Sequence, residues 1–128
     1  MIHVRGKIKE VEMDVNNNIL SSVKLSLGIT DEYTHFDQQI VMCINTVFST
    51  LYQLGIGPKG GYRITTGDEE WTDLLGDDPR IDFVKDYVVL RVKMIFDPPT
   101  SGVLVDALKR EIDELTWRIN VAVDPDEG

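Results

Sequence analysis

The sequence has few of the residues on which many protein classes depend. Its 128 residues include one cysteine, Cys43, and two histidines, His3 and His35. A single cysteine cannot form an internal disulfide or a four-cysteine zinc site, so disulfide-rich secreted domains are excluded and a reducing cytoplasm is expected. No apolar run approaches the ~18 residues of a membrane span, and residues 1–12 lack the apolar stretch of a secretion signal. These absences predict a cytoplasmic protein with no membrane partner.

Negative charge is in excess and is concentrated in two segments. The formal net charge is −9. Six acids and no base lie between residues 68 and 78, and three acids lie between 124 and 127, so these nine account for the whole excess. Proteins that grip nucleic acid do so through clustered Lys and Arg. The sequence therefore argues against electrostatic binding of nucleic acid, whereas repulsion of DNA remains open.

Length and apolar spacing predict one all-α domain, a compact bundle of about four main helices. A chain of 128 residues is long enough to bury a core without disulfides or metal. Apolar residues recur at spacings of three and four. The predicted helices span about 18–27, 34–54, 79–96 and 101–120.

Capping residues mark the ends of these helices. Asn18 is placed to cap the first helix at its start, and Gly28 suits the left-handed residue that follows its end. Thr34 is predicted to begin the second helix in a capping box with Asp37. Asp78, followed by a proline, predicts the start of the third helix.

The last predicted helix, capped by Thr100 or Ser101, carries a narrow apolar stripe. Pairs at i and i+4, such as Glu114 and Arg118, predict an outer face that is solvated or meets a polar partner. Trp117 lies off the stripe, so it is either a second core contact or an interface anchor. The stripe consists of Leu104, Leu108, Ile112, Leu115 and Ile119.

Residues 55–78 are predicted to form a long, acidic, glycine-rich loop between the second and third helices. A loop of this length in a compact domain is usually functional or mobile. It has few apolar side chains, and we expect Trp71 to pin it to the body.

No catalytic motif is present. Cys43 is surrounded by apolar residues and is predicted to lie in the core. Glu111 with Glu114, and Glu70 with Asp73, have spacings that could hold Mg²⁺ between helices, as in all-α nucleotide pyrophosphohydrolases. Neighbouring arginines favour a salt-bridged, solvated face instead. The sequence predicts no enzymatic activity, no cofactor and no metal site.

Residues 1–12 do not fit a single strand, because their apolar residues alternate on one parity up to Ile8 and on the other from Val11. Codons for residues 9–13 can contain a purine-rich ribosome-binding sequence just before an internal start codon. We hypothesise that Met13 is the natural start and that residues 1–12 are a mobile or non-native leader. The alternative is an ordered arm that docks on a neighbour. The chain then divides into the leader, a helical domain over 13–121 and an acidic, flexible tail over 122–128.

Six segments, in their order and spacing, resemble the bacteriophage head-tail connector (adaptor) family. The resemblance covers about residues 18–121, and no single segment carries it alone. The segments are Ile19-Leu20-Ser21-Ser22-Val23-Lys24, Gly28-Ile29, Leu54-Gly55-Ile56-Gly57-Pro58, Val84-Lys85-Asp86-Tyr87-Val88, Phe96-Asp97-Pro98-Pro99 and Glu114-Leu115-Thr116-Trp117-Arg118-Ile119-Asn120.

The resemblance implies an all-α structural subunit of the virion, assembled in the host bacterial cytoplasm and without catalytic residues. Such proteins form a ring, twelve-membered in the virion, beneath the portal protein. The ring extends the DNA channel, through which DNA passes without specific binding, and offers a docking surface to the tail or a head-completion protein.

In such a ring we expect an acidic loop that faces the channel or a partner, and a last helix that contacts neighbouring subunits. Two alternatives remain: a small acidic helical interaction module without ring assembly, and a Mg²⁺-dependent nucleotide pyrophosphohydrolase. The loop candidates are Asp68, Glu69, Glu70 and Asp73, and the helix candidates are Arg110, Trp117 and Arg118.

Overall fold

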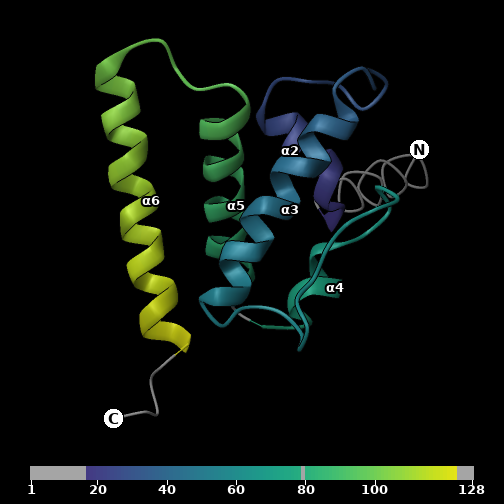
Figure 1. The fold of residues 1–128 in the computed structure, drawn as a ribbon, viewed down its shortest axis with the longest axis vertical. Coiled ribbons are helices and arrows are strands. Elements are labelled where there is room, and N and C mark those ends of the chain that lie inside the picture. The colour runs from purple at the N-terminus through teal and green to yellow at the C-terminus, as the bar shows by residue number, and fades with distance from the viewer. Residues whose placement is uncertain (1–16, 79, 124–128) are drawn as a thin grey trace, which may run out of the picture.

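Five helices follow one another in residues 17–78 and 80–123, the part of the chain that the computed structural model describes (Figure 1). They are α2 (Ile19–Ser26), α3 (Asp37–Gln53), α4 (Trp71–Leu75), α5 (Ile81–Phe96) and α6 (Gly102–Val123). Four of them match the predicted main helices, so the all-α prediction is confirmed; α4 is a short addition within the predicted loop. The hypotheses on residues 1–12 and 124–128 lie outside the described residues, whereas residues 122 and 123 belong to α6.

Helix α2 has the ends that its sequence predicts. The Asn18 side chain accepts a hydrogen bond from the Ser21 N–H (2.8 Å). At the other end Gly28 has φ +80°, a conformation that costs glycine little. The Ile29 N–H then turns back to the Lys24 carbonyl (2.9 Å), which completes the C-terminal cap.

The predicted start of the second helix is wrong. Helix α3 begins at Asp37, and no side chain caps it. The Asp37 carboxylate instead lies 2.8 Å from Nζ of Lys24, a buried residue that also donates to the Asp31 carbonyl (3.0 Å). A buried ammonium group needs a counter-charge. Lys24 therefore pairs with the Asp37 carboxylate, which the capping-box pattern had predicted to bond back to Thr34.

Helix α5 is helical throughout, although its residues 87–96 are rich in β-branched side chains, which are typical of strands. Val84, Val88 and Val92 are fully buried. The helix starts at Ile81, slightly later than predicted. Asp78 still marks this start, because its side chain accepts from the Arg80 N–H (2.9 Å).

Helix α5 is the central element of the fold. It packs along α3 on one side and α6 on another, and it also meets α2 and α4. Helix α6 forms one edge of the molecule, while α4 and loop residues 60–78 form the opposite edge (Figure 1). The loop begins at Gly55, which lies beside Val123 at the end of α6. The fold therefore presents two unlike edges, separated by the core.

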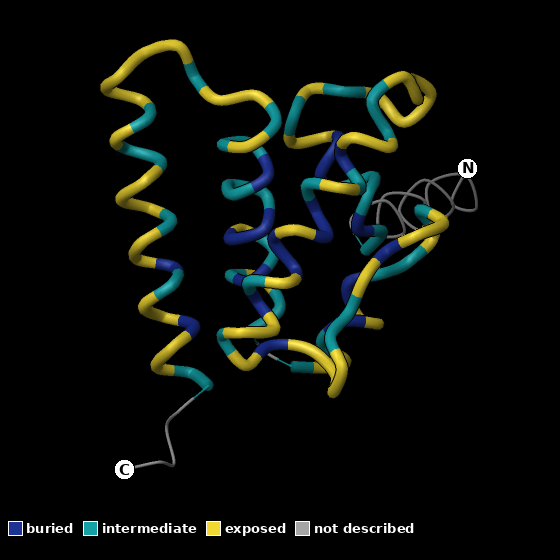
Figure 2. The backbone as a smooth tube through the Cα atoms, viewed as in Figure 1, coloured by how far each residue is buried: buried dark blue, intermediate teal, exposed yellow. Residues whose placement is uncertain are grey.

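Only the C-terminal half of α6 is buried as the apolar stripe predicts (Figure 2). Leu115 and Ile119 are buried, Leu108 and Ile112 are half-buried, and Leu104 is 56% exposed. Apolar periodicity shows which face of a helix turns inward. It does not show which turns have a neighbouring element to cover them, so the expected uniform stripe is wrong at its N-terminal end.

Candidate functional site

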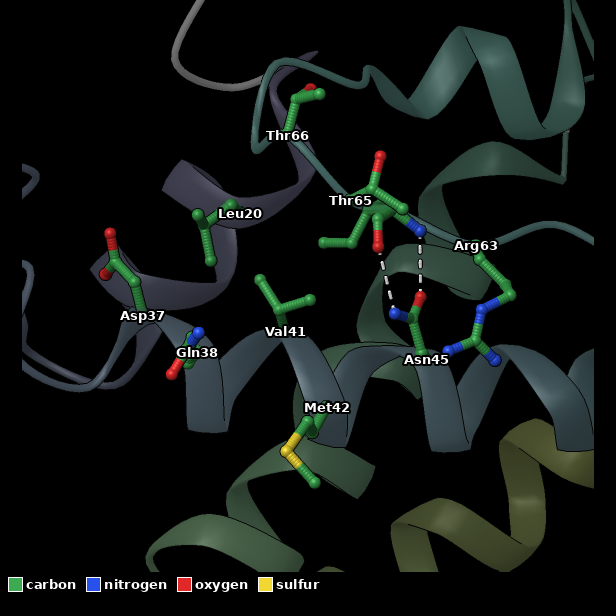
Figure 3. Close-up of a pocket in the computed structure, with 10 residues that line it drawn as sticks. Leu20, Asp37, Gln38, Val41, Met42, Asn45, Arg63, Thr65 and Thr66 are labelled. Carbon is green, nitrogen blue, oxygen red and sulfur yellow. Dashed lines mark hydrogen bonds between the residues drawn. The ribbon is translucent and has the colours of Figure 1, made fainter.

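The 55–78 loop is clamped to α3 by one amide side chain. Asn45 donates from Nδ2 to the Ile64 carbonyl (2.9 Å), and its Oδ1 accepts from the Ile64 N–H (2.8 Å) (Figure 3). Both residues are buried. The Asn45 amide thus satisfies both backbone groups of Ile64, as a neighbouring strand would.

The same loop is tied to α2. Trp71 is fully buried, and its Nε1 donates to Oγ of Ser22 (2.9 Å). The Asn18 side chain donates to the Gly67 carbonyl (2.9 Å), and the Ile19 N–H donates to the Glu69 carbonyl (3.0 Å). The prediction that Trp71 pins the loop is confirmed, and the Asn18 side chain and the Ile19 N–H, at the start of α2, contribute further contacts.

Glu69 shapes the tip of the loop. Its carboxylate accepts hydrogen bonds from the backbone N–H groups of Thr65 (2.8 Å), Thr66 (3.2 Å) and Gly67 (3.0 Å). Burial raises the pKa of Glu69, but these hydrogen bonds outweigh burial and lower the pKa to about 2. The Glu69 side chain therefore has a structural task within the loop.

The other three candidate acids differ in their surroundings. Asp73 and Glu70 form a capping box at the start of α4, in which Oδ2 of Asp73 accepts from the Glu70 N–H (2.9 Å). Asp68 is exposed. Burial, followed by the charges of Asp73 and Glu69, raises the pKa of Tyr62 to about 12. The structure thus gathers acids around α4 and Tyr62, and it leaves Asp68 on the surface.

The three candidates on α6 lie on its exposed side. Arg110 is exposed, and Arg118 forms an ion pair with Glu114 (2.9 Å). Trp117 is 65% exposed. The prediction that Trp117 is a second core contact is therefore wrong for the isolated chain. The alternative, that it anchors an interface, stays a prediction.

Six positions of α6 recur at spacings of four and three residues on the face away from Leu115 and Ile119. We call this face the outer stripe. Its apolar members include three of the most exposed hydrophobic side chains of α6, at positions 103, 117 and 121. The outer stripe consists of Val103, Ala107, Arg110, Glu114, Trp117 and Val121.

Two surface hollows that the sequence analysis missed lie side by side between α3 and the loop segment 60–66, and Arg63 lines both. We call the two together the α3 groove. At one end Leu20, Val41 and Met42 are among the lining residues (Figure 3). At the other end Tyr52 and Tyr62 line the hollow. The α3 residues that line it recur at spacings of four and three, but they mix polar, apolar and aromatic side chains, so the sequence carries no clear signal for this face. These residues are Gln38, Met42, Asn45, Ser49 and Tyr52.

The carboxylate pairs weighed as magnesium ligands do not converge. Glu70 and Asp73 belong to α4, while Glu111 and Glu114 belong to α6 at the opposite edge (Figure 1). Among the described residues, no three His, Cys, Asp or Glu side chains are grouped closely enough to hold a metal ion. Cys43 is half-buried, and burial raises its pKa. No helix within the described ranges combines the length and hydropathy needed to cross a membrane.

Comparison with known families decides the classification. The sequence pattern of the family described as phage connector protein matches residues 19–126, which is most of the chain. The chain belongs to the phage connector protein family. No curated protein and no solved structure matches it.

Membership confirms the resemblance to bacteriophage head-tail connectors, a family of structural proteins. It identifies this connector as a component of the virion that assembles with other virion proteins. The matched residues span all five described helices, so the outer stripe, the α3 groove and the acidic loop all lie inside the connector domain.

Proposed function

We propose that this connector is one subunit of a ring, twelve-membered in the virion, that sits beneath the portal protein. The ring extends the DNA channel and offers the tail or a head-completion protein a docking surface. The family match over residues 19–126 carries this proposal.

The two unlike edges of the fold support a ring. A cyclic assembly joins one surface of each copy to a different surface of the next, and it closes when the rotation between copies allows. Helix α6 presents the outer stripe at one edge, and α4 with loop residues 60–78 forms the other (Figure 1). Each copy therefore has two different surfaces to offer to its two neighbours.

The acidic loop supports a channel through which DNA passes without adhering. The segment 68–78 contains six acids and no base. If these acids approach the lumen, neighbouring copies surround the DNA with negative charge, which repels phosphate. The same charge disfavours the empty ring, so a portal or raised salt promotes assembly.

Sedimentation of the full chain, alone and mixed with the portal protein of the same phage, tests this function. The expected result is a ring-sized species, or a complex that forms once the portal is added. A species that stays monomeric at high concentration and ignores the portal contradicts the proposal. That result favours the alternative, a small acidic interaction module without ring assembly.

A further inference from the structure

We propose that Trp117 of one copy inserts into the aromatic end of the α3 groove of the next copy, with Glu114 facing Arg63. This inference rests on the proposed function, because it names the contact that joins neighbouring subunits. It assigns the α3 groove, for which no role follows from the sequence, to a second copy of this chain.

The aromatic end of the groove is suited to a planar ring. Phe48, Tyr52 and Tyr62 line it, together with Gly60 and Gly61, and its volume is about 370 Å³. Tyr52 is 49% exposed. A Cβ at Gly60 would meet nothing within 4 Å, so the glycine wall is open. Aromatic side chains that pack against one another gain energy beyond the area they bury.

Trp117 is the matching protrusion. It is the largest exposed apolar side chain of α6, and it belongs to the outer stripe, which points away from its own chain. Tryptophan is among the residues most enriched at the energetic centres of interfaces. Because Trp117 faces away from its own core, a groove on another copy is the one that it can fill.

Charge favours the same arrangement. Arg63 is exposed and lines the groove beside Asn45 (Figure 3). Among the described residues it forms no ion pair. Asp113 and Glu114 precede Trp117 by four and three residues, so they flank it on the helix surface. A Trp117 seated in the aromatic end therefore brings carboxylates towards the cation that borders the groove.

The arrangement is directional. The outer stripe and the α3 groove are different surfaces, so each copy inserts its own Trp117 and receives that of a neighbour. Such head-to-tail contacts generate a ring when the rotation between copies closes, as the proposed function requires. A two-fold dimer would instead place the same surface of both copies in contact.

Cross-linking between two single-cysteine variants tests the contact. Both carry Cys43→Ala, and the new cysteines are Val121→Cys, one turn beyond Trp117, and Gln53→Cys, which lines the aromatic end. We expect a short bis-maleimide reagent to join the two variants when they are mixed, with the portal present if assembly needs it, and to join neither variant to itself.

Matched positions define the control. Val121→Cys mixed with Gln38→Cys, at the far end of the groove, should give no product, and neither should a mixture with Leu25→Cys, which is exposed on α2. Equal cross-linking to Gln38→Cys, or cross-linking of Val121→Cys to itself, overturns the inference.

Association measurements supply a second readout. We expect Trp117→Ala to weaken self-association or portal-dependent assembly by at least about tenfold, as for an interface anchor. Leu25→Ala, at a comparably exposed residue, should leave assembly unchanged. Arg63→Glu and Glu114→Arg should each weaken assembly, and the double variant should recover part of the loss. Circular dichroism confirms that each variant stays folded.

The outcomes separate this inference from the proposed function. A ring that forms equally well with Trp117→Ala and shows no cross-link at Gln53 refutes the contact and leaves the ring function intact. A chain that neither self-associates nor binds the portal overturns both.

Discussion

Replacing Glu69 by Gln tests whether one carboxylate holds the tip of the acidic loop. Glutamine keeps the shape but loses the negative charge, and its NH₂ group faces donors if the amide is turned the wrong way. The pKa of Glu69 is held at about 2, below its ordinary value of 4.5. If the whole difference in pKa between the unfolded and folded chain contributed, Glu69 would add roughly 3 kcal/mol to the free energy of unfolding at neutral pH. Screening around a partly exposed group reduces the expected loss to about 1–2 kcal/mol.

The pH dependence of the same variant gives a sharper result. Because folding lowers the pKa of Glu69, its contribution is fully present above pH 4.5 and is lost as the pH falls towards 2. Urea unfolding should therefore show a gap between the wild type and Glu69→Gln that is constant above pH 5 and shrinks at lower pH. Asp68→Asn, which changes an exposed acid nearby, should cost less than ~0.5 kcal/mol. A gap of the same size at pH 7 and pH 2 would show that the charge of Glu69 does not stabilise the loop.

Three further predictions concern the core, the loop clamp and the charge of the loop. Ile119→Ala should lower the unfolding free energy by about 2–5 kcal/mol because it leaves a cavity, whereas Leu104→Ala should lower it by less than about 1 kcal/mol. Equal losses in thermal unfolding would show that the buried half of α6 is misassigned. Asn45→Ala should cost about 2–3 kcal/mol because it strands two buried backbone groups, and hydrogen exchange should show the loop opening faster; unchanged exchange counts against the clamp. Neutralising the exposed Asp68 and Asp77 should strengthen assembly at low salt and increase nonspecific DNA binding in filter assays, and raised salt should likewise strengthen assembly of the unchanged chain. No change in either assay would place these acids away from the channel.

Helix positions could be predicted because their signals are local. Asn18 and Gly28 mark the ends of α2 through contacts within a few residues, and the apolar spacing of α5 is unbroken. The predicted cap at Thr34 is wrong because the Asp37 carboxylate forms an ion pair with the buried Lys24, which lies in the preceding helix, outside the capping-box spacing. A cap predicted from spacing can be displaced by a tertiary ion pair.

The candidate surfaces were only partly predictable. The place of Trp117 off the apolar stripe left two alternatives, a core contact and an interface anchor, and only the structure shows that the side chain is exposed. The α3 groove did not follow from the sequence, because it depends on the clamp between Asn45 and Ile64, which joins residues nineteen positions apart. The structural task of Glu69 was also hidden, since its partners are backbone N–H groups that become available only when the loop turns. Hydrogen bonds between side chains and backbone groups that are distant in the chain produce no repeating pattern in the sequence, so they could not be predicted from it.

Cryo-electron microscopy of phage heads that contain the portal, with and without the added connector, decides whether the connector forms a ring there. We expect an extra ring beneath the portal, with α6 of each copy against the loop-bearing side of the next and a continuous central channel. Heads whose portal carries no added density, while the connector stays monomeric in solution, would rule out the proposed ring.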